Sequence, residues 1–266
     1  MRALSLVAAA MLLECAPDAA QNALLDRIRR VDEGVVRLSY AVRDGICGDG
    51  ATFIRDHARG EENYISFEGR WNRSDRYKAD RVCEPGPARV AIHKSGGMVT
   101  RVNVYVGRTW DRSETEVTDL GEVAAAEAAR ALIGLAALER RAGKAIFAST
   151  IADSVVIWPQ LLTLAKNDDV AISVRKDAVF WISQAAGDAA TKGLADLAEN
   201  DRENRDVRDQ AVFAISQRPA DEGVPVLIRL AKTNPDPSVR RKALFWLGQS
   251  DDPRALKVFE EILTKG

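Results

Sequence analysis

The chain has 266 residues and 46% of them are hydrophobic, which allows one or two domains with ordinary buried cores. Its 38 Lys and Arg residues nearly balance its 39 Asp and Glu residues. Without an excess of positive charge, no long-range field draws the chain to nucleic acid or to an anionic bilayer, so we expect no nucleic-acid partner.

Residues 1–20 have the pattern of a secretory signal peptide. One positive residue, Arg2, precedes about ten apolar residues, and small residues follow as far as Ala20. This run is too short to span a bilayer, and no later segment approaches 18 apolar residues. We therefore expect export to the periplasm or secretion. Two alternatives remain open: a lipid anchor at Cys15, whose neighbour Glu14 is a poor match, and a cytoplasmic protein with a misread start.

Residues 21–120 are expected to form a small antiparallel β domain. Apolar and polar residues alternate over Val36–Val42, Ala88–Lys94 and Val99–Val106, which is typical of strands with one face buried. The glycine turn at Ser95–Gly97 predicts that the last two strands form a hairpin. The polar side chains predict that the other face of the sheet meets solvent.

The cysteines of this region predict a disulfide. If Cys15 leaves with the leader, Cys47 and Cys83 remain as an even pair, each followed by turn residues. A bond between them would stabilise the domain by ~4 kcal/mol on the chain-entropy estimate. A metal or redox site would need further ligands or a Cys-x-x-Cys spacing, and neither is present. The charged segment Arg59–Arg81 between them is assigned only as strands joined by loops.

From residue 121 to 266 the chain is expected to be helical. The residues Asp119–Glu122 are typical of a helix start, and Val123–Ala142 is rich in Ala, Leu, Glu and Arg. A second helix is predicted over Ala152–Lys166. Pro159 lies either in the first turn of that helix or at a kink, because proline lacks the amide hydrogen needed further inside.

A motif then recurs at nearly constant spacing. The pattern Val-Arg-x-x-Ala-x-Phe-x-x-x-Gln starts at Val174, Val207 and Val239, so its copies are 33 and then 32 residues apart. Similar apolar segments alternate with it at residues 161–166, 194–199, 227–232 and 259–264. A fixed period in this range predicts helix pairs that stack on one another, about four of them here, because a lone pair cannot bury its apolar faces. Asp236 is the expected N-cap of the third copy, with Pro237 at its first helical position.

The segment Asp236–Gly248 carries a family resemblance. Its run Asp-Pro-x-Val-Arg-x-x-Ala-x-x-x-Leu-Gly resembles the short bacterial form of the HEAT repeat, also found in phycobilin lyase-like proteins. The resemblance covers roughly Val155–Gly266. The whole chain is similar to exported bacterial HEAT-repeat proteins of unassigned role with a β domain before the repeats. It implies an α+β protein, a small antiparallel β domain followed by an α-solenoid of HEAT-like helix pairs, and no particular reaction.

Three sets of repeated residues are candidate surface or packing positions. The arginines are Arg175, Arg208 and Arg240. The glutamines are Gln184, Gln217 and Gln249. The aromatic residues are Phe180, Phe213, Phe245, Trp181 and Trp246.

Each set has a structural and a functional interpretation. The arginines follow Asp169, Asp206 and Asp236, so they could form a ladder of ion pairs that ties each loop to the next repeat. The alternative is a row of cations that binds an acidic partner, and we favour the ladder. The glutamines are expected to cap helix ends rather than to contact a ligand. The aromatics are expected to pack inside the solenoid, although any that are exposed would be the best candidates for a partner-binding groove.

The sequence offers no catalytic residue, metal site or cofactor motif. Only His57 and His93 are present, and no Gly-x-Ser-x-Gly, His-Glu-x-x-His, P-loop or dinucleotide motif occurs. A metal site built from both histidines with Asp49 or Asp56 remains an alternative.

We therefore expect a non-enzymatic scaffold of the bacterial cell envelope that binds an unidentified protein through its solenoid. The β domain would dock a partner or pack against the first repeat. A second hypothesis is a lyase- or hydrolase-like accessory with a deep ligand pocket near His57, His93 or the Tyr64–Tyr77 segment. A third is a redox-responsive envelope regulator, which requires an exposed or strained Cys47–Cys83 bond.

Overall fold

The computed structural model describes residues 23–51, 53–56, 63–66, 83–107, 110, 115–185 and 187–265. The predicted leader, Cys15, His57 and most of the segment 59–81 lie outside these residues, as do the side chains of Tyr64 and Tyr77.

In the described part of the chain, seven strands form two sheets. They are β1 (Gly34–Tyr40), β2 (Ile46–Gly48), β3 (Phe53–Asp56), β4 (Asn63–Ser66), β5 (Ala88–Ser95), β6 (Met98–Val106) and β7 (Val117–Glu122). The larger sheet has the order β6-β5-β1-β7 and the smaller one the order β2-β3-β4. The predicted hairpin of β5 and β6 is confirmed, with its turn at Gly96 and Gly97.

The larger sheet is mixed rather than purely antiparallel. Strands β1, β5 and β6 are antiparallel to their neighbours, but β7 pairs parallel to β1. Since β6 and β7 run in the same direction on opposite edges, the chain between them must cross the sheet. Trp110 of that connection lies over the guanidinium groups of Arg37 and Arg89, at 4.8 and 5.3 Å from the ring centroid. Both arginines are buried, so this part of the face expected to meet solvent is covered.

The helix start predicted at Asp119–Glu122 is wrong. These residues end strand β7, in which Val117, Thr118 and Asp119 pair with Val35, Val36 and Arg37 of β1. The pairing partner lies about 80 residues earlier in the sequence, and its ladder of hydrogen bonds overrides the local helical preference. The helix begins instead at Ala125, after Gly121 adopts a φ of +74° that a helix would not accept.

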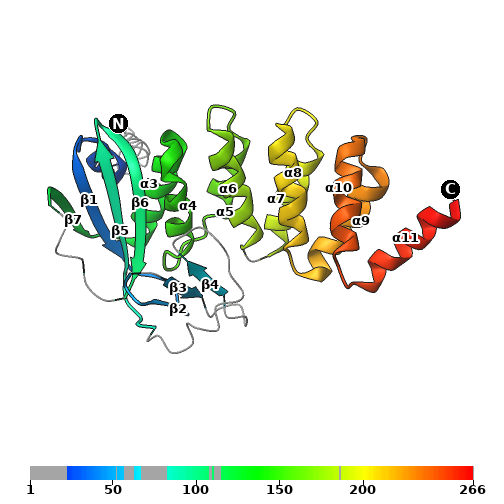
Figure 1. The fold of residues 1–266 in the computed structure, drawn as a ribbon, viewed down its shortest axis with the longest axis horizontal. Helices are drawn as coiled ribbons and strands as arrows, with labels where there is room; N and C mark the ends of the chain where they lie inside the picture. The colour runs from blue at the N-terminus through cyan, green and yellow to red at the C-terminus, as the bar shows by residue number, and fades with distance from the viewer. Residues whose placement is uncertain are drawn as a thin grey trace, which may run out of the picture.

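The helices stack as pairs along the long axis of the molecule (Figure 1). They are α2 (Ala23–Arg29), α3 (Ala125–Leu138), the 3-10 turn η2 (Arg140–Ala142), α4 (Gly143–Thr150), α5 (Trp158–Lys166), α6 (Ile172–Ser183), α7 (Asp188–Glu199), α8 (Arg205–Ser216), α9 (Ala220–Thr233), α10 (Pro237–Gly248) and α11 (Pro253–Lys265). Four pairs, α3/α4, α5/α6, α7/α8 and α9/α10, precede the single helix α11. Pro159 lies in the first turn of α5, the first of the two predicted positions, because the residues from Ala152 to Ile157 are not helical.

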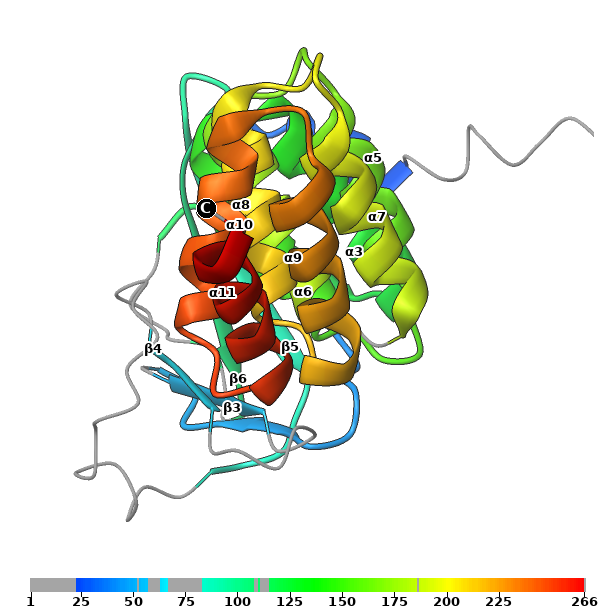
Figure 2. The ribbon, with the colours of Figure 1, turned by 90° about the vertical axis from the view of Figure 1, so that its right-hand side faces the viewer.

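The pairs form two layers. Helices α4, α6, α8 and α10 follow one another in a second-helix layer, and α3, α5, α7 and α9 form a first-helix layer beside it. Figure 2 shows α8 and α10 on the left and α5, α7 and α9 on the right. The second helices contact one another more extensively than the first helices do. Regular translation from copy to copy confirms the predicted solenoid.

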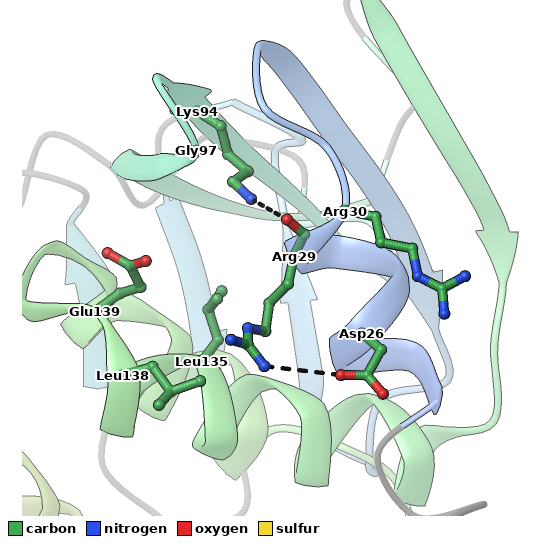
Figure 3. Close-up of a pocket in the computed structure, with 8 residues that line it drawn as sticks. All are labelled: Asp26, Arg29, Arg30, Lys94, Gly97, Leu135, Leu138 and Glu139. Atoms are coloured by element: carbon green, nitrogen blue, oxygen red, sulfur yellow. Dashed lines mark hydrogen bonds and ion pairs between the residues drawn. The ribbon is translucent and has the colours of Figure 1, made fainter.

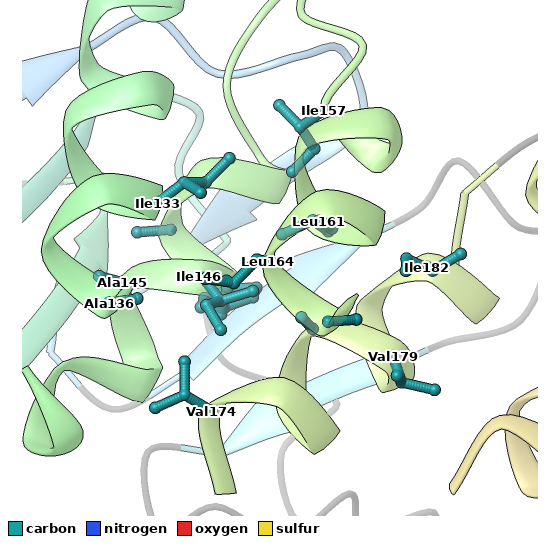
Figure 4. Packing of buried hydrophobic residues seen from close by; sticks show 14 of the residues in the cluster. Ile133, Ala136, Ala145, Ile146, Ile157, Leu161, Leu164, Val174, Val179 and Ile182 are labelled. Atoms are coloured by element: carbon teal, nitrogen blue, oxygen red, sulfur yellow. The ribbon is translucent and has the colours of Figure 1, made fainter. Parts of the chain in front are cut away.

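One hydrophobic core runs from the sheet into the repeats. Ile133 of α3, Ile146 of α4, Leu161 of α5 and Ile182 of α6 all belong to one cluster of buried side chains (Figure 4). At the other end of this cluster, α2 lies against α3, where Gly134 leaves room for Leu25. The sheet and the first helix pair are therefore packed as one unit.

Backbone pairing also joins the sheet to the first helix pair. The residue after β1, Ala41, accepts a hydrogen bond from the amide of Asp153, and the amide of Arg43 donates to Ile151, each at 3.0 Å. Arg43 then bonds the carboxylate of Asp56 in β3, with one contact of 3.1 Å. The linker between β1 and β2 thus forms a bridge to the linker between α4 and α5, and the β domain closes the N-terminal end of the solenoid.

Candidate functional site

Two of the three repeated arginines, Arg175 and Arg208, form ion pairs between repeats as expected, but with partly different carboxylates. Arg208 pairs with Asp236, the N-cap of the next second helix, at 3.0 Å. Arg175 is buried, bonds Asp168 at 2.8 Å and forms an ion pair with the buried Glu203 of the next loop. Neither Asp169 nor Asp206, the two partners expected from spacing, pairs with an arginine in the described structure.

The last arginine differs from the other two. Arg240 donates to the carbonyls of Asn234 and Pro235 in its own loop, at 2.8 and 2.9 Å. Within the part of the chain that the structure describes, no carboxylate pairs with it. Each of the two earlier arginines pairs with a carboxylate of the repeat that follows, Arg175 with Glu203 and Arg208 with Asp236.

The repeated glutamines are the C-cap residues of α6, α8 and α10. In α6 the amide of Gln184 donates to the hydroxyl of Ser183 at 3.0 Å, and this hydroxyl donates to the carbonyl of Phe180 at 2.6 Å. Helix α8 repeats the arrangement with Gln217 and Ser216. In α10 a glycine replaces the serine. In α6 and α8 the glutamine amide thus reaches the last helical turn through a serine. Gln217 and Gln249 are exposed to solvent.

The repeated aromatics lie between the core and the surface. Phe180, Trp181, Phe213 and Trp246 are half-buried, and Phe245 is 56% exposed. Trp246 of α10 packs against Phe213 of α8, with ring centroids 5.0 Å apart. Neither simple interpretation describes the whole set, because Phe213 packs against the next second helix whereas Phe245 is exposed and contacts Trp246 of its own helix.

Helix α4 is an earlier copy that the sequence motif does not reveal. Phe147 contacts Trp181 of α6 at 5.2 Å, as Phe213 contacts Trp246. The hydroxyl of Thr150 donates to the carbonyl of Phe147, as the serine does in α6. The motif is hidden in α4 because Arg141, Ala142 and Ile151 replace its Val, Arg and Gln, and only Ala145, Phe147 and the hydroxyl three residues later are kept.

Sequence reasoning also missed a buried polar network between repeats. Arg218, directly after Gln217, donates to the carbonyls of Ser183 and Gly187 at 3.0 and 3.1 Å and pairs with Glu222 at 2.7 Å. Thr191 also bonds Glu222. These contacts tie α9 to the loop between α6 and α7. Nothing in the repeat pattern signals them, since the copies have Ala or Ser at the position of Arg218.

A pocket of about 430 Å³ lies between α2, the turn of the β5–β6 hairpin and the end of α3 (Figure 3). Its buried cation, Lys94, donates to the carbonyls of Ile28 and Arg29 at 3.1 Å each and so caps α2. Burial lowers the pKa of Lys94, against the opposing effect of Glu139 and Asp32. Asp26 and Glu139 share the pocket with the cations, so the charges balance largely within the protein.

This pocket is not where the ligand-binding hypothesis placed it. His93 lies on the opposite phase of β5, where its ring is 3.3 Å from both Arg101 and Asn103. Within the described residues, no group of three or more His, Cys, Asp or Glu side chains is placed to hold a metal ion. None of the described helices is long and apolar enough to cross a membrane.

The predicted disulfide is present. Cys47 of β2 is bonded to Cys83, which closes the segment that contains β3 and β4. Cys47 is only 8% exposed and Cys83 is half-buried. The bond is thus shielded from solvent on the Cys47 side. The redox-regulator hypothesis requires an exposed or strained bond.

Comparison with known families agrees with the geometry. A family model described as HEAT repeats matches residues 191–266, from α7 to the end of the chain. No curated protein matches the chain. Stacked repeats of this kind present extended surfaces suited to protein binding.

Proposed function

We propose that this protein is a non-enzymatic scaffold that holds a protein partner against the exposed side of α6, α8 and α10. The observation that carries the proposal is a repeated pair of side chains, Phe and Gln four residues apart, on three adjacent helices. The pairs are Phe180/Gln184, Phe213/Gln217 and Phe245/Gln249. We call these six residues the Phe–Gln array.

The chemistry of the Phe–Gln array suits a polypeptide. Exposed edges of phenylalanine rings bring large contact area at low entropic cost, which is typical of binding hot spots. The amide of each glutamine can both donate and accept, as a partner's backbone requires. Repetition across adjacent helices favours an extended contact over a small molecule in a closed site.

The scaffold is rigid where it meets the β domain. Burial of Leu132, Ile146 and Leu161 in one continuous cluster fixes the first two helix pairs to the sheet. Arg218 and Glu222 tie later pairs together in the same way. A rigid surface binds with a smaller entropic cost than a mobile one, which supports this role.

We place this scaffold in the bacterial cell envelope. The Cys47–Cys83 bond supports an oxidising compartment, since intracellular reductants keep most cysteines reduced. The leader pattern of residues 1–20 supports export.

Site-specific photocrosslinking tests the partner surface. A photoreactive phenylalanine in place of Gln217 should give discrete protein adducts in the envelope fraction, whereas the same residue in place of Asp196, exposed on α7, should not. Replacing Gln184 and Gln249 by Glu in the same chain should weaken the adducts, because the bound partner would have to cover two carboxylates. Equal adducts from both positions, or none from Gln217, would contradict the proposed surface.

A further inference from the structure

The pocket between α2, the β5–β6 hairpin and the end of α3 holds charges of both signs on different sides (Figure 3). Lys94 and Arg29 bring positive charge from β5 and α2, and Glu139 brings negative charge from the end of α3. Arg30 also lines the pocket, but Figure 3 shows its guanidinium group turned away from the other side chains. The volume of about 430 Å³ lies within the range of small-molecule sites, about 300–1,000 Å³.

Lys94 is a buried cation without a carboxylate partner. It is 6% exposed, and its ammonium donates to the carbonyls of Ile28 and Arg29. A lysine has three N–H donors, so these two bonds leave one donor unused. Among the residues that the structure describes, no carboxylate pairs with Lys94. Because buried charges in proteins are normally paired, the space beside this ammonium favours an anion.

The pKa of Lys94 points to the same local lack of negative charge. Burial lowers this pKa and the charge of Arg29 lowers it further, whereas Glu139 and Asp32 raise it. Since the pKa is lowered on balance, the two carboxylates do not compensate for burial. Arg29 is held only loosely by Asp26, at 3.8 Å and with both side chains more than half exposed, so a carboxylate of a ligand can compete for it.

The opposite side of the pocket favours positive charge. Glu139 is half-buried, and its carboxylate has no hydrogen-bond or ion-pair partner within the described part of the chain. Figure 3 shows Glu139 and Arg29 on opposite sides of Leu135. Leu138, which also lines the pocket, is 58% exposed. A ligand that fits this arrangement has a carboxylate at one end, an ammonium at the other and an apolar body between them.

We propose that this pocket binds an apolar dipeptide through its two free termini. The carboxylate of the peptide meets Lys94 and Arg29, its ammonium meets Glu139, and an apolar side chain covers Leu138. A free amino acid fits less well because its two charges stand on one carbon, whereas each residue of an extended peptide adds about 3.3–3.6 Å. None of the six residues of the Phe–Gln array lines the pocket, so the inference goes beyond the proposed function.

Isothermal titration calorimetry on the full-length protein tests whether both termini are recognised. The probe is the dipeptide Leu-Leu. It is compared with its N-acetylated form, which lacks the ammonium, and with its C-terminal amide, which lacks the carboxylate. Each blocked form should bind at least about tenfold more weakly than the free dipeptide, because hydrogen bonds to a charged group are lost. Free leucine should also bind more weakly than Leu-Leu.

Substitutions at the pocket separate binding from folding. Glu139→Lys should lose affinity for Leu-Leu and gain affinity for N-succinyl-leucine, in which a carboxylate takes the place of the ammonium. A folding defect cannot produce this change of preference. Arg29→Gln should weaken Leu-Leu binding about tenfold without lowering the melting temperature, because this arginine is largely exposed. Asp196→Lys, on the exposed side of α7, is the control and should change the affinity for neither ligand.

Three results would overturn the proposal. The first is that Leu-Leu does not bind the wild-type protein with a dissociation constant below about 1 mM. The second is that the blocked forms bind as tightly as the free dipeptide. The third is that Glu139→Lys keeps the preference for Leu-Leu over N-succinyl-leucine. None of these results bears on crosslinking at Gln217, so the two proposals fail separately.

Discussion

The phenol of Tyr40 in β1 donates a buried 2.6 Å hydrogen bond to the carbonyl of Ala148 in α4, 108 residues further along the chain. Burial raises the pKa of Tyr40, so the hydroxyl keeps its proton and remains a donor at any physiological pH. This hydrogen bond joins the central strand β1 to helix α4 inside the core.

Tyr40→Phe is expected to lower the free energy of unfolding by about 1–2 kcal/mol, because the carbonyl of Ala148 would stay buried without a partner. Urea denaturation followed by circular dichroism measures this. Thr163→Val, which removes an exposed hydroxyl on α5, should cost under about 0.5 kcal/mol. If both changes lower the free energy of unfolding by the same amount, the Tyr40–Ala148 hydrogen bond stabilises the fold no more than an exposed hydroxyl does.

Glu203→Ala is expected to destabilise the protein by about 3–5 kcal/mol, because it leaves the buried guanidinium of Arg175 without that carboxylate. Arg240→Ala removes the corresponding but half-buried arginine of the last copy and should cost under about 1 kcal/mol. The double change Arg175→Met with Glu203→Leu should cost less than Glu203→Ala alone. If urea denaturation shows the double variant to be less stable than Glu203→Ala, this reasoning is refuted.

Acid should weaken the link between α7 and α9. The hydrogen bond from Thr191 lowers the pKa of Glu222, and the hydrogen bond and charge of Arg218 lower it further, against the opposing effect of burial. A carboxyl whose folded pKa is depressed stabilises the fold fully above its unfolded pKa, near 4.3, and loses that contribution as the pH falls through the folded pKa. The melting temperature of Glu222→Gln should therefore fall less than that of the wild type between pH 5 and pH 3. If the melting temperatures of the wild type and of Glu222→Gln fall equally between pH 5 and pH 3, Glu222 does not contribute to the acid sensitivity.

The Cys47–Cys83 bond should resist mild reductant in the folded protein, because Cys47 is buried. Mass spectrometry after thiol alkylation should show the bond intact without denaturant and opened with it. Rapid reduction of the native protein would instead support a redox-responsive role. Replacing both cysteines by alanine should cost up to ~4 kcal/mol on the chain-entropy estimate and leave the helical repeats folded.

The repeats could be predicted from sequence because their signals are local. Val174, Val207 and Val239 recur at the period of one helix pair, and their burial follows from that period. The end signals Asp236 and Pro237 also act within one turn, and Asp236 accepts from the amide of Ser238 as an N-cap should.

The errors all involve partners that lie far away in sequence. Residues Val117–Asp119 became a strand because β1 was available, and no local pattern announces that pairing. Spacing suggested Asp169 and Asp206 as ion-pair partners, whereas the loop geometry brings Glu203 to Arg175. Trp110 gave no sign that it would cover Arg37 and Arg89.

Because the sheet packs against one end of the helical array, the helices are expected to unfold locally in a fixed order. In a nearest-neighbour array, fraying starts where a unit has the fewest contacts. Helix α11 meets α9 and α10 on one side only, so its amides should exchange with deuterium fastest among the helices of the array, and protection should rise toward α4.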